Sequence, residues 1–466
     1  MGSRSHVVLF HLIYINSSLS LSTLGTYYFC LLCPLSSYNY NCAIMANTAP
    51  KVAEEERQEA SEVVDRKADA LVTRIKKSKH FIAFTGAGVS TSAGIPDFRG
   101  PTGVWTLRAQ GKQPTGKVNT LQAVPTPTHM ALVELQRRGI LKYLVSQNCD
   151  GLHRKSGILP DSISELHGNS NREYCRDCGK EYIRDFRAVA SYEKTVRDHR
   201  TGRKCARCGG VLLDSIINFG ENLFAEPLQR ARDHAQKADL CLALGSSLTV
   251  SPANEIPETV GSRRGAKLAI CNLQSTPIDK LADLRIFSKA DDLMIRVMEK
   301  LGIPIPPFIL RRLLVVKLET VGDERYQLTV TGVDVDGTPV TYLRSVKLDH
   351  NRRLVRSEPF VINFRGGLEP GTELNLTLEF MGHYGEPNLD IVQYYDSEAR
   401  AETFYLLEYN PQNGLWTTTR KDTLDLGGGM NEDAMKEENS ILSLTGDTTI
   451  PDNVQLSSAA NTFEEN

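Results

Sequence analysis

FIAFTGAG, at residues 81–88, joins a short apolar run to a glycine loop. The apolar residues at 81–84 predict a short buried strand. Gly86 and Gly88 would let the backbone approach a ligand closely, and the N-terminus of a following helix would attract pyrophosphate oxygens. The third glycine of the usual dinucleotide signature is missing, because Val89-Ser90-Thr91 comes next. The loop alone therefore leaves two interpretations open: a dinucleotide site or a tight strand-to-helix turn.

Apolar strand patterns and helical patterns alternate on both sides of this run. We expect further strands at Ile140–Ser146, Ala238–Leu244, Lys267–Asn272 and Leu284–Phe287. Amphipathic helical patterns occupy Ala53–Lys77, Met130–Arg138 and Leu228–Lys237. Strand–helix alternation with short connections predicts an α/β fold with a doubly wound, Rossmann-like parallel sheet.

Four cysteines form two Cys-x-x-Cys pairs, Cys175 with Cys178 and Cys205 with Cys208. A glycine follows each pair and would let the chain turn so that both thiolates point at one ion. Four thiolates with no histidine nearby predict a closed tetrahedral zinc site, which is structural rather than catalytic. The spacing between the pairs exceeds the usual roughly 15–20 residues, so we expect a small insertion. The alternative is four unrelated free thiols, which would require chance to place two glycine-terminated Cys-x-x-Cys pairs close together in the sequence.

The zinc module, at about residues 168–215, falls between the second and third predicted strands. It is therefore inserted into the α/β domain, which we place at 46–303. Residues 304–310 form a proline-rich linker, because proline fixes the backbone and excludes a continued helix. Residues 311–420 alternate apolar and polar positions between turn signals, which predicts an all-β, sandwich-like domain. The tail 421–466 is rich in Gly, Asn, Glu and Ser, and we expect it to be disordered.

Length and composition limit the classes of protein to which this chain can belong. A chain of 466 residues exceeds one ordinary core. The net charge of −2 gives no global attraction to nucleic acid or to a membrane. Zinc thiolates beside unpaired cysteines indicate a reducing compartment, so we predict no disulfides.

The first 45 residues differ from the rest of the chain. Val7–Ile15 and Leu19–Leu35 are apolar, but neither is a long enough uninterrupted run to span a membrane. We expect that translation begins at Met45 and that the preceding residues are an artefact of start-site choice. The alternative is a targeting segment.

A series of motifs that begins at the glycine loop resembles, in the same order along the chain, the motifs of one family. That family is the sirtuins, which are NAD-dependent protein deacylases. The resemblance covers about Val72 to Ile303 and includes TGAGVS at 85–90, AGIPDFRG at 93–100 and GVW at 103–105. It continues through QNCD at 147–150, HG at 167–168, FGE at 219–221, GSSL at 245–248 and CNLQ at 271–274. The GVW sequence is similar to the class IV branch, whose animal members are nuclear chromatin enzymes.

The resemblance implies that NAD+ lies between the sheet and the zinc lobe, and that Zn2+ binds the four cysteines. The acyl-lysine amide oxygen would attack the ribose C1′ and displace nicotinamide. His167 would be the general base that activates a ribose hydroxyl, a task that suits a near-neutral pKa. Asn148 and Asp150 complete the implied catalytic set, whereas we expect His129 and His153 to be structural.

The family pattern also implies the cofactor-binding residues. Asp97 and Ile95 would hold the carboxamide, Phe98 would shield the reactive face, and Arg99 and Trp105 would contact and cover the cofactor. The full implied set is Gly86, Ala87, Gly88, Ser90, Ile95, Asp97, Phe98, Arg99, Trp105, Gln147, Asn148, Cys149, Asp150, Gly245, Ser246, Ser247, Asn272, Leu273, Gln274 and Ala290. At Gln274 this chain departs from the family pattern, because many relatives carry an acid there.

The acyl-lysine peptide would bind as an extended strand, with modest sequence selectivity. The main-chain carbonyl of Ile217 would accept the substrate Nε–H, and Phe219, Gly220 and Glu221 would line the same site. The resemblance implies action on histones or other chromatin proteins. It also implies a nuclear location, with the cytoplasm as the next possibility. We further expect no membrane partner and a monomer. The alternatives are a protein mono-ADP-ribosyltransferase and a non-catalytic NAD-sensing chromatin scaffold; the intact His167, Asn148 and Asp150 argue against the second.

Overall fold

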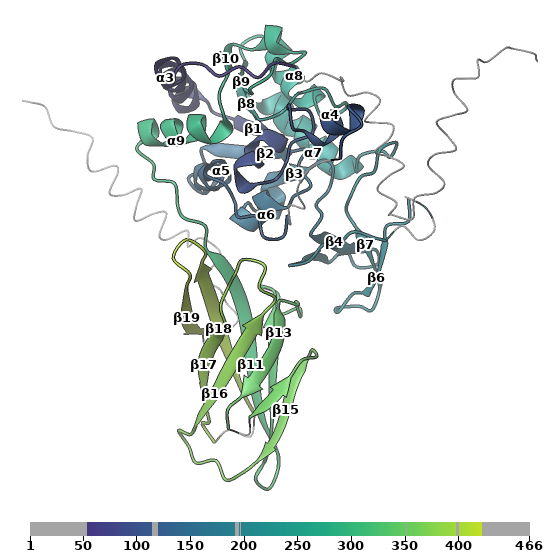
Figure 1. Ribbon diagram of the computed structural model, residues 1–466, viewed down its shortest axis with the longest axis vertical. Helices are drawn as coiled ribbons and strands as arrows, with labels where there is room; N and C mark the ends of the chain where they lie inside the picture. The colour runs from purple at the N-terminus through teal and green to yellow at the C-terminus, as the bar shows by residue number, and fades with distance from the viewer. Residues whose placement is uncertain are drawn as a thin grey trace, which may run out of the picture.

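The computed structural model describes residues 54–421, except for 114–119, 192–194, 196, 351 and 398–399. The predicted N-terminal extension and, apart from Lys421, the predicted tail lie outside the described residues. An α/β domain occupies one end of the molecule and an all-β domain the other (Figure 1). None of the helices in the described part has the length and apolar character needed to cross a bilayer.

A parallel six-stranded sheet forms the α/β domain, in the order β10-β9-β8-β1-β2-β3. The strand β1 pairs with β2 on one side and with β8 on the other, so FIAFT lies at the centre of the sheet. Its five residues are all buried, and the first four are those for which the sequence predicts a buried strand. The strands are β1 (Phe81–Thr85), β2 (Leu141–Ser146), β3 (Ile163–Glu165), β8 (Leu240–Leu244), β9 (Lys267–Cys271) and β10 (Leu284–Ile286).

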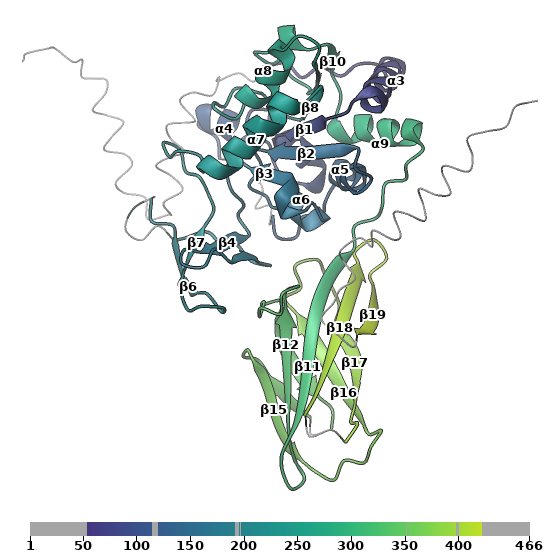
Figure 2. The same ribbon diagram turned by 180° about the vertical axis from the view of Figure 1, so that it is seen from behind.

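Helices cover both faces of this sheet, which confirms the doubly wound fold (Figure 2). Phe81 and Ala83 of β1 pack in one core with α3 (Ser61–Lys77), α5 (Pro127–Arg137) and α9 (Ala290–Leu301). Ile82 and Phe84 point to the other face, where they pack with α7 (Ala225–Lys237) and α8 (Glu255–Ser262). The shorter helical elements are α4 (Val104–Ala109), α6 (Leu152–Ser156), η1 (Ala87–Val89), η2 (Thr91–Ala93), η3 (Pro160–Ser162) and η4 (Asp279–Leu281).

Two sequence predictions in this domain are wrong. The first helix begins at Ser61, not at Ala53, because residues 54–60 are extended and pass the C-terminal ends of β9 and β10 instead. Arg57 N–H donates to the Leu273 carbonyl over 2.8 Å, and Glu59 N–H donates to the Phe287 carbonyl over 2.8 Å. In addition, the glycine loop leads into the two short 3₁₀ turns η1 and η2 rather than into a full helix.

The predicted zinc module, called the zinc lobe from here on, is a small antiparallel sheet inserted between β3 and α7. Its strand order is β5-β4-β7-β6. Its core includes the buried Tyr182 and Leu212 and two of the four cysteines. The strands are β4 (Arg172–Cys175), β5 (Glu181–Ile183), β6 (Arg200–Lys204) and β7 (Val211–Asp214).

The C-terminal domain consists of two antiparallel sheets that share one apolar core, as expected for a sandwich. One sheet has the order β15-β12-β11-β18-β19 and the other β14-β13-β16-β17. The strands are β11 (Leu310–Gly322), β12 (Arg325–Val333), β13 (Leu343–Leu348), β14 (Arg353–Val355), β15 (Phe360–Arg365), β16 (Glu373–Phe380), β17 (Leu389–Tyr394), β18 (Arg400–Asn410) and β19 (Leu415–Lys421).

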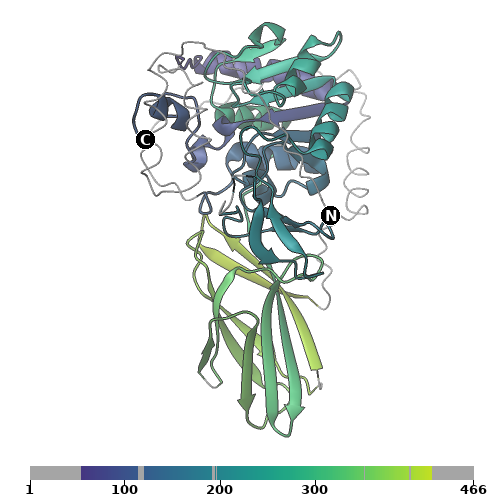
Figure 3. The same ribbon diagram turned by 90° about the vertical axis from the view of Figure 1, so that its right-hand side faces the viewer.

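This sandwich contacts both lobes of the α/β domain. Figure 1 and Figure 3 show the zinc lobe's strands to one side of the molecule, level with the junction of the two larger domains. Phe308 and Leu310 pack against Met130 of α5 in a small buried cluster. On the zinc lobe, Lys180 Nζ lies 3.0 Å from carboxylate oxygens of Asp334 and Asp336. The sandwich is therefore docked on the catalytic domain and does not merely follow it along the chain.

Candidate active site and zinc centre

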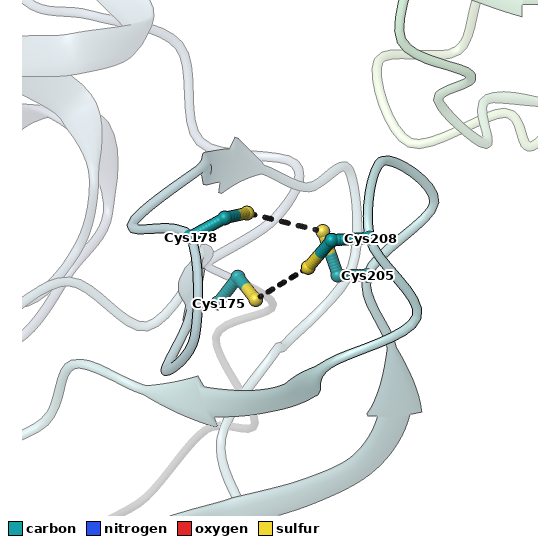
Figure 4. A group of neighbouring side chains, drawn as sticks. All are labelled: Cys175, Cys178, Cys205 and Cys208. Atoms are coloured by element: carbon teal, nitrogen blue, oxygen red, sulfur yellow. Dashed lines mark hydrogen bonds between the residues drawn. The ribbon is translucent and has the colours of Figure 1, made fainter.

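The four predicted zinc ligands come together between two facing turns of the zinc lobe (Figure 4). All four Sγ atoms lie within 4.8 Å of one another. Cys175 Sγ lies 3.4 Å from Cys208 Sγ, and Cys178 Sγ lies 3.7 Å from Cys205 Sγ. Four sulfurs at Zn–S distances of about 2.3 Å would be about 3.8 Å apart in a tetrahedron. The cluster therefore fits a tetrahedral Zn2+ ion.

Each Cys-x-x-Cys-Gly segment makes the same tight turn. Gly179 N–H donates to the Cys175 carbonyl, and Gly209 N–H donates to the Cys205 carbonyl. The two glycines have φ of 73° and 75°, in the left-handed region that other residues rarely adopt. This is the turn that the sequence predicts for both pairs.

A large cavity of about 1180 Å³ separates the sheet from the zinc lobe. It lies at the carboxyl ends of the parallel strands, where open α/β sheets bind their ligands. Every predicted cofactor and substrate residue lines it except Ser90 and Asp150, which lie just behind its wall. Sequence reasoning missed further lining residues, because only the folded chain brings them here: Glu56, Thr91, Arg108, Ser170, Arg187 and Lys289.

The glycine loop forms the floor of this cavity by packing directly against the end of β8. Gly88 N–H donates to the Gly245 carbonyl over 2.8 Å. A Cβ atom on Gly88 would lie 2.7 Å from Gly245 Cα, and one on Gly245 would lie 2.7 Å from Gly88 Cα. Only glycine at both positions permits this approach, which leaves backbone rather than side chains facing the ligand.

A hydrogen-bonded polar cluster lies beside the loop, behind the predicted nicotinamide ribose site. Asn148 Nδ2 donates to the Gly86 carbonyl over 3.0 Å, and Gln147 Nε2 donates to Ser246 Oγ over 2.7 Å. Asp150 accepts hydrogen bonds from Ser90 Oγ at 2.7 Å and from the N–H of Leu152 at 2.9 Å. These bonds fix the side chains in place before any ligand arrives.

His167 faces the cavity with its tautomer set by the backbone. Its Nδ1 lies 3.1 Å from the carbonyl oxygen of Gln147, so Nδ1 carries the proton and donates. Nε2 is then left as the basic nitrogen. Burial lowers the pKa of His167 from 6.5, although the hydrogen bond to Gln147 opposes this shift. The ring is therefore neutral at neutral pH and able to accept a proton.

The buried His129 and His153 lie behind this site rather than in it. Their ring centroids are 4.5 Å apart, and His153 Nε2 lies 2.8 Å from Thr85 Oγ1. Burial lowers the pKa of His129 to about 3. Neither histidine lines the cavity, in keeping with the structural role expected for both.

Three aromatic rings connect the predicted cofactor loop to the predicted substrate loop. Phe98 stacks on Trp105 at 5.7 Å between centroids, and Trp105 meets Phe219 edge to face at 6.1 Å. Asp97 accepts a hydrogen bond from Gly100 N–H over 2.9 Å, and burial raises its pKa. The three aromatic rings form an apolar wall of the cavity, opposite its polar cluster.

The predicted substrate loop, residues 216–221, is hydrogen-bonded to His167 through the backbone. Ile217 N–H donates to the carbonyl of His167 over 3.1 Å. Both carboxylate oxygens of Glu221 are engaged within the protein, since one accepts from Asn218 N–H over 2.7 Å and the other lies 3.1 Å from His199 Nε2. Glu221 is thus placed to hold the loop as well as to line the cavity.

A doubly wound sheet with a glycine loop, a histidine that faces its crevice and an inserted four-cysteine lobe defines a class of NAD-binding α/β protein. Residues 112–252 match the family model described as "Sir2 family". The chain is 39% identical to "NAD-dependent protein deacetylase SRT1" of Arabidopsis thaliana over 351 residues, which cover 69% of this chain and 73% of that protein. The chain belongs to the Sir2, or sirtuin, family.

Other relatives match a smaller part of the chain. "NAD-dependent protein deacetylase sirtuin-7" of Homo sapiens is 41% identical over 55% of this chain and 66% of its own length. The solved structure "Sir2 bound to acetylated peptide" is 32% identical, with a TM-score of 0.40, and the match covers 51% of this chain and 99% of that one. The match to the Arabidopsis protein is larger than residues 1–303 alone could provide, so it extends into the region of the sandwich.

Proposed function

We propose that the protein is an NAD-dependent protein-lysine deacetylase. The reaction transfers the acyl group of an acyl-lysine to ADP-ribose and releases nicotinamide and the free lysine. The observation that carries the proposal is His167, whose Nδ1 is held by the Gln147 carbonyl while the ring faces the cavity beside Asn148. Membership in the sirtuin family and the names of the relatives support the same activity.

The chain's own residues would bind and orient the two substrates. The glycine loop offers main-chain N–H groups to the pyrophosphate, since Gly86, Ala87 and Gly88 all line the cavity. Gln147, Asn148, Ser90 and Asp150 form the fixed polar cluster that would position the ribose hydroxyls and a nearby water. His167 Nε2 would take the proton from a ribose hydroxyl after nicotinamide has left.

The cofactor loop would exclude water from the reacting atoms. Asp97 would hold the carboxamide of nicotinamide, with Ile95 beside it. Phe98 and Trp105 would cover the reactive face, because their stacked rings form the apolar wall of the cavity. At the far end of the cavity, Asn272, Leu273, Gln274 and Ala290 would bind the adenosine portion.

The acyl-lysine peptide would lie as a strand between residues 216–221 and 247–250. The Ile217 carbonyl would accept the substrate Nε–H, and Phe219 would pack against the acyl-lysine side chain. Main-chain hydrogen bonds would supply much of the affinity, so sequence selectivity would be modest.

We further propose histones or other chromatin proteins as substrates, a nuclear location and a monomeric enzyme. The resemblance of the GVW sequence at 103–105 to the class IV branch supports the chromatin assignment. The test is incubation of NAD with acetylated and myristoylated histone peptides, followed by mass spectrometry. A mass gain of one ADP-ribose on protein, without loss of the acyl group, would favour the mono-ADP-ribosyltransferase alternative.

A further inference from the structure

His199 lies in the insertion between the two cysteine pairs and bridges two carboxylates. Its Nδ1 lies 2.8 Å from Asp214 Oδ1, and its Nε2 lies 3.1 Å from Glu221 Oε1. Asp214 is fully buried at the end of β7, whereas Glu221 ends the substrate loop. The ring therefore connects the zinc lobe to the loop that would hold the acyl-lysine.

The protonation state of His199 follows from this geometry. A neutral imidazole has one N–H, so one of its nitrogens would present a lone pair to a carboxylate oxygen. The imidazolium has two N–H groups and satisfies both partners. Partial burial opposes the charge, but the hydrogen bonds to Asp214 and Glu221 outweigh it, and the pKa of His199 is raised above 6.5.

Each carboxylate also orients the backbone of the substrate loop. Asp214 Oδ1 accepts from Ile216 N–H over 3.2 Å, at the loop's start. Glu221 Oε2 accepts from Asn218 N–H over 2.7 Å, and Glu221 N–H donates to the Asn218 carbonyl over 3.0 Å. Ile217, whose carbonyl would bind the substrate, lies between these two anchor points.

We propose that His199 is a positioning residue for substrate binding: as an imidazolium it ties Glu221 to Asp214 and so holds residues 216–221 in the shape that accepts an acyl-lysine peptide. This role deepens the proposed deacetylase function and rests on it. Among the residues that the structure describes, the charged groups that face the ring are Asp214 and Glu221. On its own segment, Asp198 pairs with Arg200 at 2.6 Å.

The test is His199→Gln, which keeps a donor but can no longer bond to both carboxylates as a cation. Since a hydrogen bond to a charged group is lost, the KM for an acetylated peptide should rise about tenfold. The KM for NAD and the zinc content, one ion per chain, should stay as in the wild type. His350→Gln, in the sandwich, is the matched control and should change none of these values. A peptide KM equal to that of the wild type would overturn the proposal.

The pH dependence separates positioning from a general loss of folding. In the wild type, the peptide KM should be lowest where His199 is charged and should rise as the pH passes upward through its raised pKa. In His199→Gln the peptide KM should stay high at every pH. Identical profiles for the two proteins would overturn the proposal.

Hydrogen–deuterium exchange tests the same loop without any reaction, so it still applies if the wild type releases no nicotinamide and the deacetylase assignment fails. Faster exchange at residues 216–221 in His199→Gln would support the positioning role. Unchanged exchange there would contradict it.

Discussion

Lys180 Nζ, two residues beyond the predicted zinc ligand Cys178, lies 3.0 Å from Asp334 Oδ2 of the C-terminal sandwich. A second carboxylate, that of Asp336, lies at the same distance from the ammonium group. The side chain of Lys180 is only 12% exposed. This contact and the packing of Phe308 on Met130 tie the sandwich to both lobes, between which the cavity lies.

The Lys180–Asp334 pair should contribute to the docking of the two domains. In a double-mutant cycle of Lys180→Ala and Asp334→Ala, thermal unfolding should show a coupling free energy of about 0.5–1 kcal/mol. The coupling should weaken at high salt, because Asp334 is partly exposed and its charge is screened. Strictly additive single-mutant effects would show that the pair adds nothing.

A catalytic core that ends after Pro306 should keep its activity on short acetylated peptides, since every matched motif lies before that point. It should be less stable, because removal of Phe308 and Leu310 exposes Met130. Burial of a methionine is worth about 1.5–3 kcal/mol, which corresponds to roughly 4–10 °C in the melting temperature. Loss of peptide activity in the core would show that the sandwich belongs to the catalytic fold.

Comparison of the same two proteins on nucleosomes tests a recruiting role for the sandwich. If it docks chromatin proteins, the ratio of nucleosome to peptide activity should fall in the core. Equal ratios for the core and the full chain would argue against recruitment.

Replacement of Cys175 or Cys208 with Ser should release zinc and unfold the small lobe, because structural zinc binding is itself folding free energy. Activity should be lost although neither cysteine lines the cavity. Metal analysis and circular dichroism give the readout, and Cys241→Ala, a buried thiol in the sheet, is the control that should keep its zinc. Full activity in a zinc-free protein would contradict the structural role.

The pH dependence of kcat/KM for NAD, at saturating peptide, should report His167. The base works as the neutral ring, and burial lowers its pKa below 6.5. The rate should therefore be flat near neutral pH and fall only as the pH drops through that lowered pKa. An acidic limb centred above pH 6.5 would show that another group controls the reaction.

Much of the fold could be predicted because buried strands leave a local signal. The run at 81–84 lies at the centre of the sheet. The four further strands predicted for this sheet, β2, β8, β9 and β10, begin and end within two residues of their predicted bounds. By contrast, β3 was missed because it has three residues, two of them polar. Ser164 and Glu165 are nevertheless buried, and Glu165 accepts a hydrogen bond from Asn169 Nδ2 at 2.8 Å.

The motifs identified the cavity residues, but not the contacts that organise them. The pairing of His199 with Glu221 joins an insertion with no motif of its own to the substrate loop, and only the folded lobe reveals it. Residues 54–60 fit a helical pattern locally, yet hydrogen bonds to Leu273 and Phe287 hold them against the sheet. In both cases tertiary hydrogen bonds decide the outcome, and a local pattern does not encode them.

The most direct test of the account is mass spectrometry of the products formed from NAD and an acetylated histone peptide by the wild type and by His167→Tyr. The wild type should yield nicotinamide, O-acetyl-ADP-ribose and deacetylated peptide in equal amounts. His167→Tyr should form at least 10²-fold less product while still binding NAD and peptide in calorimetry, because a general base typically contributes 10²–10⁴-fold. Product formation by His167→Tyr at the wild-type level would contradict the account. So would release of nicotinamide by the wild type without formation of deacetylated peptide.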